Sequence, residues 1–164
     1  MPVSMEVRGE IEARDKLLQT ARDLNGAPFM ASMTEAALIV ERSAKQNAPV
    51  DTGRLRGSIA HEVRTSSALG GGVNVQGVVG SNVKYAPYME LGTGTFVGRP
   101  RYFPPPSALE VWAKRHGTTA HAVAFAIWKR GGLKPRRYLQ RAFEDNKARI
   151  VAILGRGVSG IVRK

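Results

Sequence analysis

The tripeptide Asp51-Thr52-Gly53 is the clearest candidate for catalytic chemistry in this chain, because the same three residues present the catalytic aspartate of aspartic proteases. In those enzymes the tripeptide ends a buried apolar strand, and two copies face each other so that two carboxylates share one proton. Here a single copy follows Pro49 and precedes Arg54, whose charge favours the ionised form of the aspartate. The sequence therefore argues against a protease.

The same tripeptide suits a tight corner between two elements. Asp51 can cap a turn with its carboxylate, Thr52 can assist it, and Gly53 permits a positive φ. Arg54 can return a charge-assisted contact to Asp51, which we expect to be braced by this arginine or by its own backbone. These residues predict a rigid corner that leads from a long helix into a strand.

The other chemically capable side chains do not form a recognisable catalytic or metal site. The chain has no cysteine, which excludes disulfides, thiolate ligands and cysteine nucleophiles. His61 has no second histidine one helical turn later, and His116 and His121 stand five residues apart across a glycine. No Gly-x-Ser-x-Gly elbow is present, and the glycines of "LGTGTFVG" miss the dinucleotide-binding spacing. We expect no enzyme activity, no metal and no cofactor.

The positive charge is concentrated near the C-terminus. The whole chain carries a net charge of +12, and residues 114–164 hold 13 basic against 2 acidic residues, a net of +11. Such a region favours an acidic protein surface or a polyanion as its neighbour, although a solvated helix face explains the charge equally well. Tyr102, Trp112 and Trp128 could stack on bases, but the apolar neighbours of the two tryptophans at helical spacing predict that both tryptophans are buried.

Apolar spacing predicts the elements of the N-terminal half. Residues 5–11 alternate weakly as in a short strand, and helices are expected over 11–24 and, with stronger amphipathic spacing, over 28–46. Pro49 ends the second helix. A strand over 58–65, a glycine-rich turn and a strand through Val73, Val75 and Val79 predict an antiparallel hairpin.

The C-terminal half begins with a Pro/Gly-rich and aromatic loop over 85–106, which is long enough to be an interaction surface. Ser107 and Glu110 form a capping-box pattern for a short helix to Arg115, and Thr119 can cap another helix that ends at Gly131-Gly132. A last helix is expected from Pro135 to Gly155. Residues 155–164 are expected to be a basic mobile tail.

These elements predict an α+β fold, in which the long amphipathic helix packs on a small antiparallel sheet and further helices follow the loop. Hydrophobic residues make up 43% and charged residues 23% of the 164 residues, which is typical of one globular domain, here expected over 1–154. No run approaches the apolar length of a membrane span or a signal peptide. We expect a cytoplasmic protein or a part of a soluble assembly.

Three stretches, taken in order, resemble the tail-component family of long-tailed bacteriophages. They are "APVDTGRLRGSI" at 48–59, "VGSNVKYAPYMELGTG" at 79–94, and a Pro/aromatic segment followed by "PRRYLQRAFEDNKARI". The family is typified by phage Hong Kong 97, and its members are also called tail completion or head–tail joining proteins. The resemblance covers roughly residues 28–154. This sequence departs from shorter members by an added helix pair at about 107–132.

The resemblance implies a non-enzymatic α+β virion protein, assembled in the host cytoplasm, that forms a ring, usually hexameric, at the head-proximal end of the tail. Its partners would be the tail tube or terminator and the head–neck connector, with transient proximity to DNA and no membrane. The alternative is a basic DNA-binding accessory protein of a phage or prophage. The implied corner and strand entry consist of Pro49, Asp51, Thr52, Gly53, Leu55, Arg56 and Ser58. The candidate subunit or partner contacts are Tyr85, Glu90, Gly92, Thr93, Arg136, Arg137 and Arg141.

Overall fold

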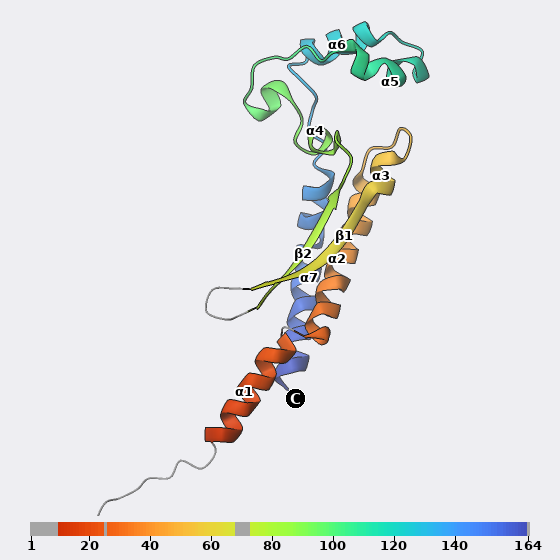
Figure 1. The fold of residues 1–164 in the computed structure, drawn as a ribbon. Coiled ribbons are helices and arrows are strands. Elements are labelled where there is room, and N and C mark those ends of the chain that lie inside the picture. The colour runs from red at the N-terminus through yellow and green to blue at the C-terminus, as the bar shows by residue number, and fades with distance from the viewer. Residues whose placement is uncertain (1–9, 25, 68–72, 164) are drawn as a thin grey trace, which may run out of the picture. The chain divides into compact units, whose positions relative to one another are not determined.

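The computed structural model describes residues 10–24, 26–67 and 73–163 (Figure 1). The chain divides into two compact units. Unit 1 consists of Met1–Arg42, Ala60–Val79 and Asp145–Lys164, and unit 2 consists of Ser43–Ile59 and Gly80–Glu144. Two helices and both strands contribute residues to each unit.

Unit 1 is built around helices and one hairpin. Its elements are α1 (Glu10–Leu24), most of α2 (Ala27–Asn47), most of the two strands β1 (Ile59–Ser67) and β2 (Val73–Ser81), and the larger part of α7 (Tyr138–Val162). The strands form a two-stranded sheet, so the predicted hairpin and the α+β fold class are confirmed. The predicted helices at 11–24 and 28–46 are also confirmed, and α2 ends before Pro49 as expected. Glu10 and Ile11 are helical, and the rest of the strand expected over 5–11 lies outside the described residues.

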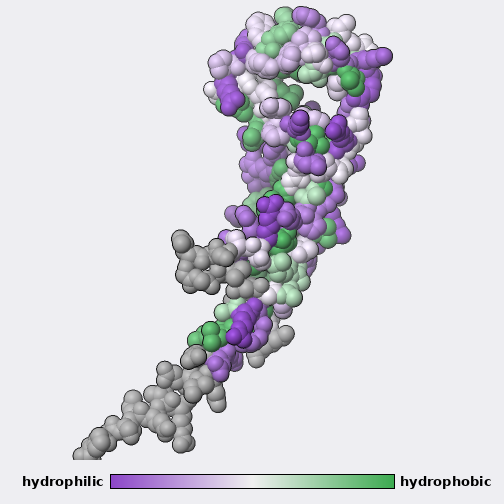
Figure 2. Space-filling model, in the orientation of Figure 1, coloured by the Kyte–Doolittle hydropathy of each residue, from purple (hydrophilic) through white to green (hydrophobic). Residues whose placement is uncertain are grey.

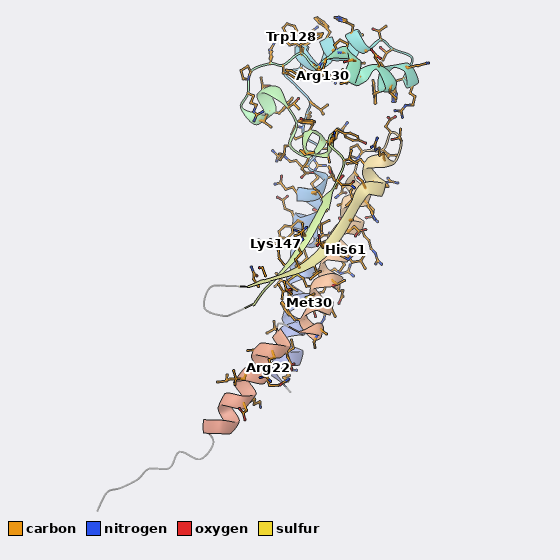
Figure 3. The ribbon with its side chains drawn as sticks, viewed as in Figure 1. Arg22, Met30, His61, Trp128, Arg130 and Lys147 are labelled. Atoms are coloured by element: carbon orange, nitrogen blue, oxygen red, sulfur yellow. The ribbon has the colours of Figure 1, made fainter. Side chains whose placement is uncertain are left out.

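Small side chains let the elements of unit 1 approach closely. Gly77 of β2 faces Met33 and Ala37 of α2, so the hairpin packs on that helix. On β1, Ile59, His61 and Val63 are more buried than the residues between them, which is the predicted period of two. His61 contacts the carboxylate of Glu41 in α2 through a partly buried ion pair (Figure 3).

Unit 2 contains the corner after α2 and the segment that the sequence predicted as a loop. That segment is partly helical: it holds α4 (Ala86–Leu91) and the 3₁₀ turn η1 (Gly94–Val97), and it runs to η2 (Pro106–Leu109). The predicted helix pair is present as α5 (Glu110–Arg115) and α6 (Ala120–Lys129). In Figure 1 both helices lie in the segment coloured from blue-green to cyan.

One predicted cap of this helix pair is confirmed and the other is wrong. The Thr119 hydroxyl accepts a hydrogen bond from the backbone N–H of Ala122 at 3.2 Å, as expected for a cap of α6. Ser107 instead lies inside η2, and the cap position of α5 is Leu109, which has no side-chain cap. Three prolines precede Ser107, and the last of them starts a tight 3₁₀ turn, which moves the cap position by two residues, from Ser107 to Leu109.

The last helix differs from the prediction at both ends. It starts at Tyr138 rather than at Pro135, because Arg137 has a positive φ of 52° that no α-helix can contain. It also passes through Gly155 and continues to Val162, where a mobile tail was expected. Gly157 packs against Ser32 of α2 and Ile161 is buried, so tertiary packing outweighs the weak helix propensity of glycine.

The buried apolar side chains are mostly small. The set in unit 1 is Ala36, Ala37, Val40, Ile153 and Ile161. The set in unit 2 is Ala44, Ala48, Leu55, Ile59, Ala86, Ala113, Ala124, Tyr138 and Ala142. Since alanine buries little area, close approach of the backbones and polar contacts must supply much of the stability. Within the described ranges, no helix combines the length and apolar character needed to cross a membrane.

Two glycines of α7 give a matched test of this packing. Gly155→Ala should raise the free energy of unfolding by about 0.5–1 kcal/mol, because alanine is the better helix former and no atom lies within 4 Å of the new methyl. Gly157→Ala should lower it by about 1–3 kcal/mol, because the methyl would lie 2.5 Å from the Ser32 hydroxyl and 2.9 Å from its Cβ. Urea unfolding of both variants measures the difference. Equal effects would show that α7 does not pack on Ser32.

Candidate functional site

The two motif stretches meet at a pair of serine hydroxyls in unit 2. Ser58 ends α3 (Arg54–Ser58) and Ser81 ends β2, and their Oγ atoms lie 2.7 Å apart. The Ser58 hydroxyl donates its one proton to the carbonyl of Leu55 at 2.8 Å, so Ser81 must be the donor to Ser58. Ser81 in turn accepts from the backbone N–H of Val83 at 3.2 Å. This chain of hydrogen bonds fixes the entry of β1 to the exit of β2.

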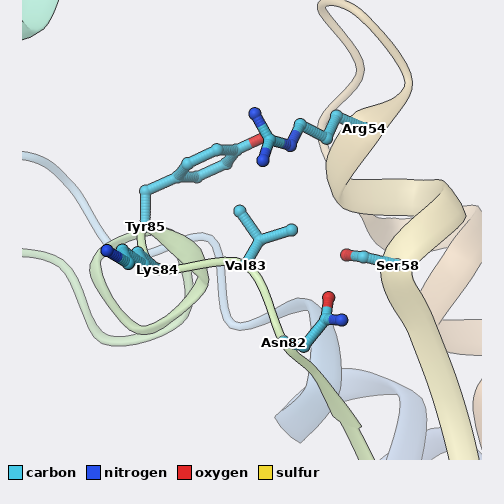
Figure 4. Close-up of a pocket in the computed structure, with 6 residues that line it drawn as sticks. All are labelled: Arg54, Ser58, Asn82, Val83, Lys84 and Tyr85. Atoms are coloured by element: carbon cyan, nitrogen blue, oxygen red, sulfur yellow. The ribbon is translucent and has the colours of Figure 1, made fainter.

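A pocket of about 430 Å³ opens beside this serine pair (Figure 4). Its lining consists of Arg54, Ser58, Asn82, Val83, Lys84 and Tyr85. In Figure 4 the Arg54 guanidinium and the Tyr85 ring reach toward one another over it. The lining contains two cationic side chains and no carboxylate, which suits an anionic group with an apolar neighbour. Arg54 belongs to the first motif stretch and Tyr85 to the second.

The corner around Asp51 is braced differently from the sequence expectation. Asp51 pairs with Arg115 of α5 at 3.0 Å and with the ring of His116 at 3.1 Å, instead of with its own backbone or Arg54. The sequence could not reveal this partner, because it lies more than sixty residues further along the chain. These groups are about two-fifths exposed, so the pair adds little free energy and serves mainly to fix geometry.

The remaining corner residues adopt the expected local conformations. Gly53 has the positive φ of 78° that its place in the motif predicted. The Thr52 hydroxyl accepts a long hydrogen bond of 3.4 Å from the backbone N–H of Arg54. Leu55 is buried, while Arg56 is exposed. Asp51 therefore sits in an open structural corner, and its partners are the Arg115 guanidinium and the His116 ring rather than the second carboxylate that proton sharing in a protease requires.

Glu90 holds the start of α7. Its two carboxylate oxygens accept hydrogen bonds from the backbone N–H groups of Leu139 and Gln140, both at 2.9 Å. Its carbonyl accepts from the N–H of Arg137 at 3.1 Å, and the carbonyl of Met89 accepts from the N–H of Arg136 at 2.8 Å. A negative side chain from a distant segment thus caps the positive end of the last helix.

The glycine-threonine stretch after Glu90 continues this contact as a backbone seam. The N–H of Thr93 donates to the carbonyl of Leu133 at 2.9 Å, and the Thr93 hydroxyl accepts from the N–H of Leu133 at 2.8 Å. Gly92, with φ of 80°, has no room for a side chain, because an added Cβ would lie 2.5 Å from the Leu133 carbonyl oxygen. Glu90, Gly92 and Thr93 therefore have defined roles inside the subunit, and their contact with another subunit stays a prediction.

Tyr138 follows the seam and is fully buried. Its hydroxyl makes no hydrogen bond within the described part of the chain. Burial raises the pKa of this phenol, and the negative charges of Glu90 and ionised Tyr85 raise it further.

The remaining candidate subunit or partner contacts from the sequence are all exposed. They are Tyr85, Arg136, Arg137 and Arg141.

The two tryptophans are where the sequence prediction fails most clearly. Trp112 is 40% exposed and Trp128 is 37% exposed, although both were expected to be buried. Their helices turn alanines inward instead, namely Ala113 in α5 and Ala124 in α6. A signal was present in α6, because the polar residues His121 and Lys129 lie on the same side of the helix as Trp128 and mark that side as the exposed one. Among the described residues no cluster of three or more histidine or acidic side chains could hold a metal ion.

Replacing Glu90 tests the long-range cap. Glu90→Gln leaves one acceptor oxygen for two N–H donors and removes the charge at the helix terminus, so it should lower the free energy of unfolding by about 1–2 kcal/mol. Glu144→Gln, which changes an exposed carboxylate that accepts only from the Gln140 side chain, should cost less than about 0.5 kcal/mol. Thermal unfolding followed by circular dichroism compares them. Equal losses would rule out the cap.

Tyr138→Phe removes a buried hydroxyl that has no partner. The free energy of unfolding at neutral pH should stay unchanged or rise by about 1–2 kcal/mol. Because the folded state raises the pKa of this phenol above 10.0, the wild-type protein should lose stability as the pH rises above that value. The variant should lose less over the same alkaline range. Unfolding titrations across this range would contradict the assignment if both proteins behaved alike.

Comparison with known families identifies the segment that contains both motif stretches. Residues 15–92, which are 78 of the 164 residues, match the family described as "Bacteriophage HK97-gp10, putative tail-component". Comparison with curated proteins and with solved structures gives no match. The match includes the corner and the pocket residues and ends at Gly92, before the helix pair α5–α6. Over residues 15–92 the chain is therefore similar to the HK97-gp10 tail-component family, which supports the resemblance found in the sequence.

Proposed function

We propose that the protein is a structural, non-enzymatic subunit of a ring, hexameric by resemblance, that completes the tail of a long-tailed phage and joins it to the head. The observation that carries this proposal is the match over residues 15–92, whose two motif stretches come together at the Ser58–Ser81 pair. A family of tail components acts through contacts with other virion proteins. We therefore expect the protein to lie in the neck or tail of the virion.

Two features of the fold suit subunit contacts in such a ring. Each strand of the hairpin pairs only with the other in the described structure, so each has one edge with no strand beside it. An open strand edge can pair with a neighbouring chain, and a repeated head-to-tail contact of this kind closes into a ring. The pocket offers a second contact, in which Arg54 and Lys84 would receive an acidic side chain of the neighbour or of a neck or tail partner.

The alternative function is a basic DNA-binding accessory protein. Unit 2 favours it, since it holds 14 basic and 4 acidic residues, a net of +10, against 11 and 9 in unit 1, a net of +2. We prefer protein partners, because a strongly cationic channel wall would retain DNA that has to pass through the ring.

Light scattering tests the ring. The purified protein, alone or with assembled tail tubes, should form particles of about 107 kDa, six times the 17.8 kDa of one chain. Tyr85→Ala, which removes a ring that lines the pocket, should shift the distribution toward the monomer by about tenfold in concentration. Tyr88→Ala is the matched control, because Tyr88 is exposed but does not line the pocket, and it should leave assembly unchanged. A protein that stays monomeric in both conditions contradicts the proposal.

Titration with duplex DNA separates the two functions. A ring protein should bind DNA weakly at physiological salt, and changing Arg136, Arg137 and Arg141 to glutamine should alter that weak binding little. Tight binding by the monomer, with a steep salt dependence that this triple variant abolishes, would support the DNA-binding alternative instead.

A further inference from the structure

The helix α6 exposes its aromatic side. Ala124 faces inward and is fully buried, while His121, Phe125 and Trp128, which share one side of the helix at spacings of four and three, are exposed. Phe125 is 53% exposed and its ring lies 5.8 Å from that of Trp128. Large apolar side chains of a helix are usually covered by another element. Within the described part of unit 2, Phe125 and Trp128 on the outer side of α6 stay exposed.

A second segment extends this side of α6 into a continuous surface. The ring of Phe103 lies 5.6 Å from that of His121, and the guanidinium of Arg101 stands 6.0 Å from the centre of the Trp128 ring. Residues 101–103 thus run along the exposed side of the helix, and Tyr102 between them is 55% exposed. We use the name aromatic face for the surface made by Arg101, Tyr102, Phe103, His121, Phe125 and Trp128.

Basic residues border the aromatic face. Lys129 and Arg130 follow Trp128 directly and are exposed, and Figure 3 marks Trp128 and Arg130 near the end of α6. In Figure 2 hydrophobic and hydrophilic residues intermingle over α5 and α6. An apolar centre with a charged border is the usual composition of a protein interface, in which tryptophan, tyrosine and arginine contribute most of the binding energy.

We propose that the aromatic face docks a different protein, one that presents apolar side chains bordered by carboxylates. Charge complementarity identifies this occupant. A second copy of the chain is a poor occupant, because both of its units carry a net positive charge, +10 for unit 2 and +2 for unit 1. Three of the four acidic residues of unit 2 are also engaged inside it: Asp51 pairs with Arg115 and His116, Glu90 caps α7, and Glu144 accepts from Gln140. We therefore expect the complementary carboxylates on another protein.

Nucleic acid is a weaker candidate for the aromatic face. Duplex DNA keeps its bases stacked and offers phosphates, for which this face itself supplies one arginine. Single strands would stack on free aromatic rings. Here the Arg101 guanidinium lies over one side of the Trp128 ring. The rings of Phe103 and Phe125 already contact the rings of His121 and Trp128. The face lies beyond the match at 15–92, and this inference does not depend on ring assembly.

Intrinsic fluorescence tests the proposal directly, because Trp112 and Trp128 are the two tryptophans of the chain. In a Trp112→Phe background Trp128 reports on the face alone. The probe is a synthetic amphipathic peptide with leucine and phenylalanine on one side and glutamate on the other. Its binding should shift the emission to shorter wavelength, and the peptide with lysine in place of glutamate should bind about tenfold more weakly.

Matched variants separate docking at the face from general stickiness. Phe125→Ala should weaken peptide binding by about tenfold or more, whereas Phe143→Ala, which removes an equally exposed phenylalanine from α7, should not change it. Tyr102→Ser provides a second test outside the helices, with the same expected loss, and circular dichroism verifies that each variant is folded. Equal binding of the two peptides, no binding of either, or tighter binding of single-stranded or duplex DNA than of the acidic peptide would overturn the proposal.

Discussion

The backbone seam between residues 89–95 and 131–140 is the constraint on which unit 2 depends. Two stretches far apart in the sequence are held together there by hydrogen bonds from backbone groups: α4 with η1 on one side, and the Gly131-Gly132 turn with the start of α7 on the other. Backbone bonds of this kind need close approach. Gly94 and Gly132 supply it, because a Cβ at either would clash with a carbonyl of the opposite segment. The seam therefore depends on the absence of side chains at these positions.

Glu90 links the backbone seam to the first turn of α7 and fixes where that helix begins. The first N–H groups of α7 have no partner within the helix, and that of Leu139 is partly buried, so it would be costly to leave unpaired. A carboxylate that accepts from two of them satisfies both and places its charge at the positive helix end. This explains why α7 begins at Tyr138: the cap comes from the second motif stretch, and not from a residue adjacent in sequence.

The sequence predicted the elements whose signal is local. Amphipathic spacing and Pro49 predicted the bounds of α2, and the alternation of apolar residues predicted β1. Thr119, as a capping residue, predicted the start of α6. It also predicted the positive φ of Gly53, since few other residues adopt that conformation. Each of these features depends on residues within one or two turns of chain.

The features that the sequence could not predict depend on distant partners. The brace of Asp51 comes from α5, the cap of α7 from Glu90, and the continuation of α7 past Gly155 from packing on Ser32. Local rules would end a helix at such a glycine, and only the facing surface of α2 overrides them. The exposed aromatic residues of α6 are a related case, because the burial of Ala124 depends on the elements that pack against the helix.

Which side of α6 is buried depends on the size of the side chains that the neighbouring elements leave room for. The helix packs against η2 and α5, whose own inward residue Ala113 is small, so an alanine side allows the close approach that phenylalanine and tryptophan would prevent. Turning the aromatic side inward would overpack this contact, while turning it outward leaves large apolar surface in water. The fold of unit 2 resolves this conflict in favour of close packing, which leaves the aromatic side chains exposed within the described residues. The charges of unit 2 are also unevenly matched, since it holds 14 basic residues, and three of its four carboxylates have partners within it.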